Sequence, residues 1–379
     1  MKRNLLFLFG LLLFTNSKAQ NFDTLIDKFK VNLFDLVRIP QDSVTKDTLY
    51  KTSDFEVSIS KNPITINVDS FIIKNPNYTE DIDDWDDNYI NYPKSPTVIF
   101  EENLISLFDN GKFICHSLNG YTRNRKLEEK LSSKHFNYHW SIDGELYARA
   151  RPFLFSQLYK WNGKKWVKTK IKLPFDNEPI LFADKDFIIY RKCAGEFGGT
   201  IYFYDRKSTQ TYYTDSTCSI TVAKFNGKYH VYSNLGHMMG RSKMKIIDNP
   251  KKLSKADKSQ LKSNLYNLGY QDKSRNAVTS FDLMGIQLFS SFSIDNRPML
   301  ITHLQDRTFL SEIKGRKIEI INPLFNNNKY THDPITRTYG KYILINLDFD
   351  STAMNREVSL IVIEGNSITL LDWNENQYF

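Results

Sequence analysis

Residues 108–117 read F-D-N-G-K-F-I-C-H-S, in which two short apolar segments flank a turn of Asp, Asn and Gly. These turn residues accept positive φ angles and favour a tight β-hairpin. The same pattern returns in residues 141–150, 182–191 and 224–233, and in looser form in residues 293–302 and 337–346. The sequence therefore predicts a chain built from repeated hairpins.

Most of these hairpins are followed by a second one, in residues 159–169, 201–214, 308–321 and 360–373. Two hairpins in succession predict a four-stranded antiparallel sheet. The central turns fall at Gly111, Gly144, Lys185, Gly227, Asn296 and Gly340, so the steps between them are 33, 41, 42, 69 and 44 residues. The long step is explained by an insertion at 245–277, where Leu261, Leu265 and Leu268 indicate a short amphipathic helix that begins with Ser254 as its N-cap.

Sheets of this size in tandem resemble the blades of a β-propeller, which hides its sheet faces by closing into a ring. The resemblance covers residues 97–379 and implies an all-β fold of six blades, with seven as the alternative if an early hairpin adds one. It rests on pattern and spacing, because the chain carries no named propeller signature. Two other architectures compete: an outer-membrane barrel, suggested by the terminal Phe379, and a pair of β-sandwiches, which would not explain the steady step.

The first residues predict a signal peptide at 1–19, with basic Lys2 and Arg3, an apolar run at 5–14 and S-K-A at 17–19. The rest of the chain up to residue 96 is expected to form an N-terminal extension. Within it we expect a helix at 21–39, a β-hairpin at 54–74 and a solvated acidic loop at 79–88. The protein is therefore expected to be exported, to the periplasm, the outer surface or the medium.

Composition narrows the expected partners. The formal net charge of +8 becomes 8 − 3 = +5 when the three basic residues of the signal are removed. This mild charge gives no clustered basic element of the kind that nucleic-acid binders show, and no later segment is apolar enough for a membrane span. We expect no metal and no cofactor, because the acidic loop lacks the spacing of a calcium loop. We expect a monomer.

The chain has three cysteines, Cys115, Cys193 and Cys218. An exported protein can form disulfides, so a bridge between Cys193 and Cys218 is one option. Burial as a small apolar side chain is the other option for each cysteine, and the one that we expect for Cys115.

Arginines recur in the loops that join the second strand of each predicted blade to the third. In a propeller these loops share one face, so the arginines could form a basic ring that binds carboxylate or phosphate groups. The alternative is that each arginine pairs locally, for example with Glu196, Asp306 or Glu357. The candidate ligand-binding residues, which include one loop histidine, are Arg125, Arg149, Arg151, Arg191, His237, Arg241, Arg307 and Arg356.

The sequence thus favours an exported binding or scaffold protein that recognises a cell-surface or extracellular ligand, either an anionic glycan or a cell-surface protein. The alternative function is a propeller-type hydrolase or lyase that acts on polysaccharide. The sequence names no catalytic residue for that reaction, because no pair of carboxylates recurs at an assignable spacing. Aspartate boxes of the sialidase type are absent as well.

Overall fold

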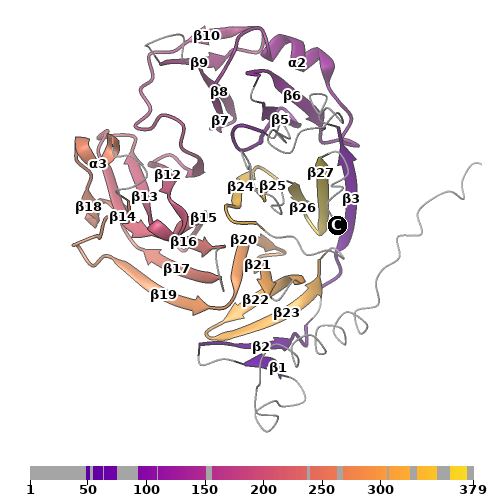
Figure 1. Cartoon of the computed structure of the whole chain (residues 1–379), viewed down its shortest axis with the longest axis vertical. Coiled ribbons are helices and arrows are strands. Elements are labelled where there is room, and N and C mark those ends of the chain that lie inside the picture. Colours follow the sequence, from indigo (N-terminus) through magenta and orange to yellow (C-terminus); the bar gives the residue numbers. More distant parts are fainter. Residues whose placement is uncertain are drawn as a thin grey trace, which may run out of the picture.

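The structure, a computed structural model, describes residues 48–51, 54–62, 64–74, 93–108, 110–150, 156–236, 240–262, 268–304, 307–324, 331–347 and 359–373. Six sheets, built mainly of antiparallel strands, are arranged around a common centre, which confirms a six-bladed β-propeller (Figure 1). The expected signal peptide at 1–19, the helix at 21–39 and the acidic loop at 79–88 lie outside the described residues.

Blade 2 has the plain four-stranded form. It consists of β7 (Tyr138–Ile142), β8 (Glu145–Ala150), β9 (Gln157–Trp161) and β10 (Trp166–Lys168), which pair in the order β7-β8-β9-β10. The first turn closes at Asp143 and Gly144, whose φ angles are 54° and 75°. A type I′ turn needs two such angles, which explains why the repeated Asp-Gly pattern was a reliable signal.

Blades 3 and 4 surround the insertion. Blade 3 contains β11 (Ile180–Ala183), β12 (Phe187–Cys193), β13 (Gly199–Asp205), β14 (Thr211–Ser216) and β18 (Ser254–Lys255). Blade 4 contains β15 (Cys218–Phe225), β16 (Lys228–Leu235), β17 (Arg241–Ile247) and β19 (Ala277–Met284). The insertion between β17 and β19 thus lends β18 to the neighbouring blade as a fifth strand.

The helix expected in this insertion is only partly correct. Helix α3 (Lys258–Lys262) is described, whereas residues 263–267 lie outside the described ranges. Ser254 is not its N-cap but part of β18, and the carboxylate of Asp257 instead accepts the backbone N–H of Gln260 at 2.9 Å. Asp257 directly precedes the helix and therefore caps it, whereas Ser254 lies three residues further from its start.

Blades 5 and 6 each gain strands from the N-terminal segment. Blade 5 contains β20 (Gln287–Ile294), β21 (Arg297–Leu304), β22 (Arg307–Lys314) and β23 (Lys317–Pro323). Blade 6 contains β24 (Ile335–Tyr339), β25 (Tyr342–Asn346), β26 (Leu360–Glu364) and β27 (Ser367–Trp373). To these sheets the chain adds β1 (Thr48–Lys51) and β2 (Glu56–Ile59) on blade 5, and β3 (Asn67–Ile73) on blade 6.

The hairpin expected at 54–74 is therefore wrong. Strand β2 pairs in parallel with β23, and β3 pairs in parallel with β27, so the two strands lie in different blades. Alternation of apolar and polar residues identifies a strand but not its partner, because any free sheet edge can accept it. The segment between them links the outer edges of blades 5 and 6.

Blade 1 corrects the sequence alignment of the repeats. It contains β4 (Val98–Phe100), β5 (Asn103–Leu107) and β6 (Phe113–Ser117), with helix α2 (Arg125–Leu131) packed beside β6. The hairpin at 108–117 joins its second and third strands, whereas the other repeats join first and second strands. The equivalent turn is Glu101-Glu102, with φ angles of 46° and 56°. Counted from Glu102, the step to Gly144 is 42 residues instead of 33.

The ring closes between blades 1 and 6. Trp373 packs edge-on against Phe108, with ring centroids 5.4 Å apart. The buried side chain of Asn346 accepts the backbone N–H of Thr97 at 2.7 Å and donates to its carbonyl at 3.1 Å. The amide of Asn346 thus satisfies both backbone groups as a neighbouring strand would. Trp373 in the last hairpin and Asn346 on β25 thus close the ring together.

Strand β24 lies at the centre of the ring and contacts the inner strands β11, β15 and β20 (Figure 1). Arg337 on β24 donates to the carbonyl of Ser141 in blade 2 at 2.8 Å, and Thr336 donates to Ser290 in blade 5 at 2.7 Å. Blade 6 therefore reaches across the axis to the other blades.

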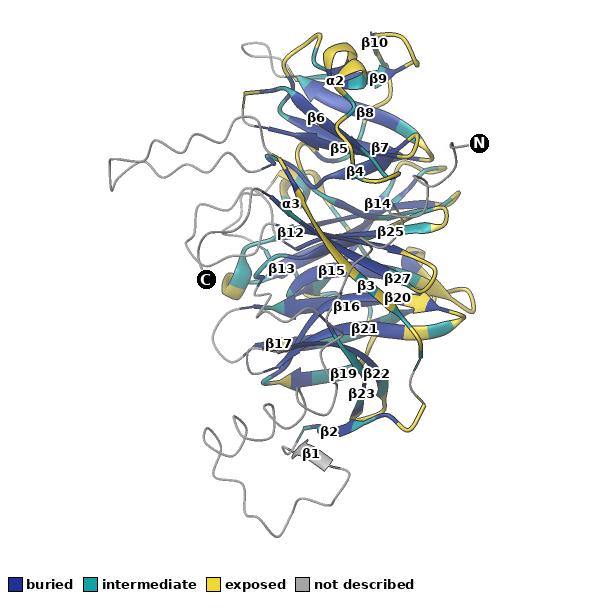
Figure 2. Ribbon diagram, turned by 90° about the vertical axis from the view of Figure 1, so that its right-hand side faces the viewer, coloured by how far each residue is buried: buried dark blue, intermediate teal, exposed yellow. Residues whose placement is uncertain are grey.

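Buried side chains fill the spaces between neighbouring sheets, as the dark strands of Figure 2 show. The outer strand β3 is largely exposed, with Phe71 and Ile72 at 45% and 52% relative exposure. Cys115 is fully buried as a free thiol, as expected. Within the described ranges, no helix combines the length and the apolar character needed to cross a bilayer.

Candidate functional site

One face of the propeller, which we call the mouth face, holds the starts of the first strands and the ends of the second strands. Arg149, near the end of β8, lies there. Its guanidinium donates to the carboxylate of Asp176, to the carbonyl of Phe175 at 2.8 Å and to Ser156 at 3.2 Å. It also stacks over Trp140, and burial lowers its pKa. Arg149 thus anchors the loop that leads into blade 3.

Arg191, near the end of β12, is only 1% exposed. It donates to the carbonyl of Ser219 in blade 4 at 2.6 Å and forms an ion pair with Asp333, which precedes β24 in blade 6. The pair joins positions 142 residues apart in the sequence. A buried guanidinium requires such a partner, so Arg191 ties three blades together at the centre of the mouth face.

The bridge between Cys193 and Cys218 is present, with the two Cα atoms 5.1 Å apart, and it joins blade 3 to blade 4. The two sulfur atoms and a carboxylate oxygen of Asp333 lie within 4.8 Å of one another. Because both sulfurs are in a disulfide, they offer no thiolate to a metal ion. The carboxylate of Asp333 meanwhile faces Arg191.

Arg241, at the start of β17, lies on the mouth face but away from the axis. Its guanidinium forms a two-pronged contact with Asp282 on β19, at 2.6 and 2.7 Å. The hydrogen bonds from Arg241 lower the pKa of Asp282, and the charge of Lys243 lowers it further, while burial partly opposes the shift. Both side chains of the pair remain partly open to solvent, at 45% and 29% exposure.

The other predicted site residues are not gathered with these. Arg125 is an exposed residue at the start of α2, after the third strand of blade 1, so its assignment to a loop between second and third strands is wrong. Arg307 begins β22, but its side chain is not described. Arg151, His237 and Arg356 lie outside the described residues.

Three of the candidate arginines thus reach the mouth face within the described residues, each beside a carboxylate from another part of the chain. Arg191 pairs with Asp333, 142 residues away, rather than with the nearby Glu196 that the sequence suggested, and Arg149 and Arg241 pair with Asp176 and Asp282, 27 and 41 residues away. The other two suggested partners, Asp306 and Glu357, lie outside the described residues. Arg241 and Asp282 lie on the paired strands β17 and β19 of one blade, whereas only the closure of the ring brings Arg191 to Asp333.

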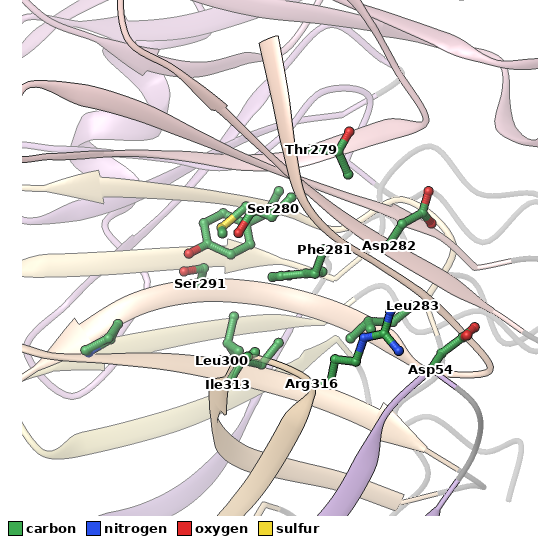
Figure 3. A pocket seen from close by; sticks show the side chains of 14 residues that line it. Asp54, Thr279, Ser280, Phe281, Asp282, Leu283, Ser291, Leu300, Ile313 and Arg316 are labelled. Atoms are coloured by element: carbon green, nitrogen blue, oxygen red, sulfur yellow. The ribbon is translucent and has the colours of Figure 1, made fainter.

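A pocket of about 510 Å³ lies between blades 4 and 5 (Figure 3). We call it the inter-blade pocket. Strand β19 lines one side with residues 279–283, and blade 5 lines the other with Leu300, Ile313 and Arg316. Tyr232, Ser291 and Asp54 complete the lining. The sequence gave no sign of it, because its walls belong to two separate sheets, and local sequence patterns do not show how neighbouring sheets pack.

The inter-blade pocket combines apolar and polar chemistry. Phe281, Leu300 and Ile313 pack into the apolar clusters between the two blades and turn part of their surface to the pocket. At one end Tyr232 is hydrogen-bonded to Ser291, and burial raises the pKa of the tyrosine. Figure 3 shows the charged side chains of Arg316, Asp54 and Asp282 together at the other end.

No family model matches the sequence, and a search of curated proteins found no match. Among solved structures, the chain is similar to the N-terminal domain of Nup159, with 6% identity, a TM-score of 0.34, and 80% of this chain and 85% of that one covered. It is also similar to BamB from Moraxella catarrhalis, with 10% identity, a TM-score of 0.30, and 76% and 85% covered.

A third similar structure is the computationally designed Ika8 protein, with 7% identity, a TM-score of 0.33, and 73% and 85% of the two chains covered. Similarities of this size carry no functional argument. The order of the sheets and their closure by Trp373 and Asn346 carry the structural conclusion. The chain is a six-bladed β-propeller with β24 at its axis.

Proposed function

We propose that this protein is an exported binding protein that holds a cell-surface or extracellular ligand in the inter-blade pocket. The volume of about 510 Å³ carries the proposal, because ligand pockets generally measure about 300–1,000 Å³ and combine apolar walls with a few polar groups. Propellers support binding and scaffold roles in general, but fold alone does not assign a ligand. The pocket supplies the specific argument.

The pocket suits a ligand that has an apolar surface next to a charged or polar group. Phe281 and Leu300 offer the apolar contact, and the exposed Arg316 offers a cation at the pocket's charged end. The mouth face is less suited to an anion, because Arg149, Arg191 and Arg241 already contact carboxylates. An acidic glycan is therefore tested as a ligand of the inter-blade pocket rather than of a ring of arginines.

The state of the carboxylates supports binding rather than glycoside hydrolysis. A glycosidase needs one carboxylic acid with a raised pKa. Among the described residues, every carboxyl group with a resolved shift has a lowered pKa, and these are Glu145, Asp184, Asp205, Asp257, Asp272, Asp282 and Glu312. These groups stay ionised and cannot serve as the proton donor at neutral pH.

The proposal is tested by filling the pocket. Ser280 lines it and is exposed, so Ser280→Trp adds an indole to the pocket without removing a core contact. Ser133→Trp, at an exposed position after α2 in blade 1, is the matched control. Both variants and the wild type are applied to arrays of acidic and neutral glycans and of extracellular peptides.

We expect Ser280→Trp to lose binding by at least about tenfold, which corresponds to about 1.4 kcal/mol, whereas Ser133→Trp binds as the wild type does. Equal loss in both variants, or equal retention in both, would contradict the assignment of the pocket. Unchanged thermal unfolding of the two variants confirms that they are folded.

A further inference from the structure

Strand β19, which lines the inter-blade pocket, is also the outermost strand of blade 4. Among the strands that the structure describes, none pairs with its outer edge. Such an edge presents backbone N–H and C=O groups that can pair with another chain. The pocket and the strand edge are therefore continuous, because the same residues 279–283 belong to both.

The outer edges of four other blades, those of β10, β18, β1 and β6, are protected. The edge strands β10, β18 and β1 have 3, 2 and 4 residues, and each ends in a lysine. Helix α2 packs beside β6 in blade 1. Short length, lysine and a covering helix are the usual protections against edge pairing. These blades are thus guarded against a further strand.

Strand β19 lacks these three protections, although its pairing with β17 shifts register at Ser280. It has 8 residues, A-V-T-S-F-D-L-M, and contains neither lysine nor proline. Val278 and Met284, near its two ends, are 61% and 45% exposed although both are apolar. Among the outer edge strands that the structure describes, β3 is also long, with 7 residues, and its Phe71 is covered in part by Tyr121 of blade 1, at 5.3 Å between ring centroids.

The charges around β19 indicate the sign of the charge that a partner should carry. Lys273 and Arg275, in the segment leading into β19, are exposed, and Arg316 and Lys317 are exposed on the facing turn of blade 5. Asp282 on β19 is already held by Arg241 and Lys243. Asp54 lines the pocket beside Arg316, and Lys317 lies 3.9 Å from Glu319. Lys273 and Arg275 therefore contribute most of the positive charge at the edge, which favours an acidic partner and speeds its encounter with β19.

We propose that β19 binds an extended acidic segment of a partner protein by β-strand addition, with apolar side chains of that segment entering the inter-blade pocket. This inference rests on the proposed function and specifies its ligand. Backbone hydrogen bonds along β19 supply affinity, and the pocket that contains Phe281 selects the alternate side chains. At about 3.3 Å per residue, a segment as long as β19 would follow its whole edge.

The test uses a display library of random peptides as long as β19, selected on the full chain and then measured as synthetic peptides. We expect enriched peptides to carry acidic residues and alternate apolar residues. Val278→Lys should weaken peptide binding by about tenfold, because a lysine on a strand edge opposes pairing. The added positive charge by itself attracts acidic peptides, so a loss of binding reports on strand pairing and not on charge. Ile72→Lys, on the comparable edge strand β3, should leave their affinity unchanged.

Peptides methylated on alternate backbone nitrogens separate strand addition from side-chain binding alone. The methyl groups remove hydrogen-bond donors without changing the side chains, so we expect them to abolish binding in one of the two alternating patterns. Binding that survives both patterns and the Val278→Lys substitution would overturn strand addition.

The outcomes also separate this inference from the proposed function. Acidic glycans that bind the wild type but not Ser280→Trp, with no peptide enriched, would support the pocket and overturn the polypeptide ligand. Peptides that bind the wild type and Ser280→Trp equally, but not Val278→Lys, would support strand addition and contradict the role of the pocket.

Discussion

The centre of the mouth face and the space between blades 4 and 5 each contain a pair of arginine and aspartate. The arginine is buried in the first region and partly exposed in the second. At the centre, Arg191 is 1% exposed and joins blades 3, 4 and 6 through Ser219 and Asp333. Between blades 4 and 5, Arg241 and Asp282 stay partly exposed beside a pocket of about 510 Å³.

This difference in burial shows which arginine stabilises the fold and which region has room for a ligand. A buried charge must be fully paired, so the guanidinium of Arg191 is committed to neighbouring blades. A solvated pair gains little stability, and Arg241 therefore mainly positions Asp282 on β19. Counting arginines along the sequence could not separate these two roles.

The largest predicted effect is the loss of stability when the pair of Arg191 and Asp333 is broken. Arg191→Ala removes the donor to Ser219 and leaves a cavity beside Asp333, whose side chain is 31% exposed. Because water reaches Asp333, we expect a cost in the lower part of the about 3–5 kcal/mol that is typical of a broken buried pair. We expect this loss in the free energy of unfolding measured with urea. Arg241→Ala, which breaks the solvated pair, should cost no more than about 1 kcal/mol. Equal costs for the two substitutions would remove the distinction between the two regions.

A smaller effect is expected on the stability of the protein at acidic pH, through the pair of Arg241 and Asp282. Arg241 and Lys243 lower the pKa of Asp282 in the folded protein. The stabilisation is therefore present above the unfolded pKa, about 3.9, and is lost as the pH falls through the lower folded value. Because the pair is partly exposed, we expect the total to stay below about 1 kcal/mol.

The measurement compares wild type with Asp282→Asn, whose side chain does not titrate, in urea unfolding at a series of pH values from neutral to acidic. The wild type should lose its advantage as the solution becomes more acidic. A difference between the two proteins that stays constant over the whole series would show that the ion pair contributes nothing.

Much of the fold follows from local signals in the sequence. The Asp-Gly and Asn-Gly turns at Gly144 and Gly227 require positive φ, and they mark the first hairpins of blades 2 and 4 correctly. In blade 1 that role falls to Glu101-Glu102, a pair without a turn signature, so the repeat was aligned on the wrong hairpin.

The site was harder to predict because its parts meet only when separate sheets pack against one another. Arg191 and Asp333 are neighbours only because β24 crosses the axis. The walls of the inter-blade pocket come from β19 and blade 5, and no sequence pattern links them. The Cys193–Cys218 bridge was the one long-range contact that the sequence offered as an option, because few cysteines leave few pairings.

The most direct test of the account is amide hydrogen exchange on the full chain, with and without the tightest binder found on the glycan and peptide arrays. We predict slower exchange over residues 277–284 of β19 and the facing turn at 313–316, with no change over residues 187–193 of β12 and 335–339 of β24. Slower exchange confined to β12 and β24 would place the ligand at the mouth face and contradict the central claim.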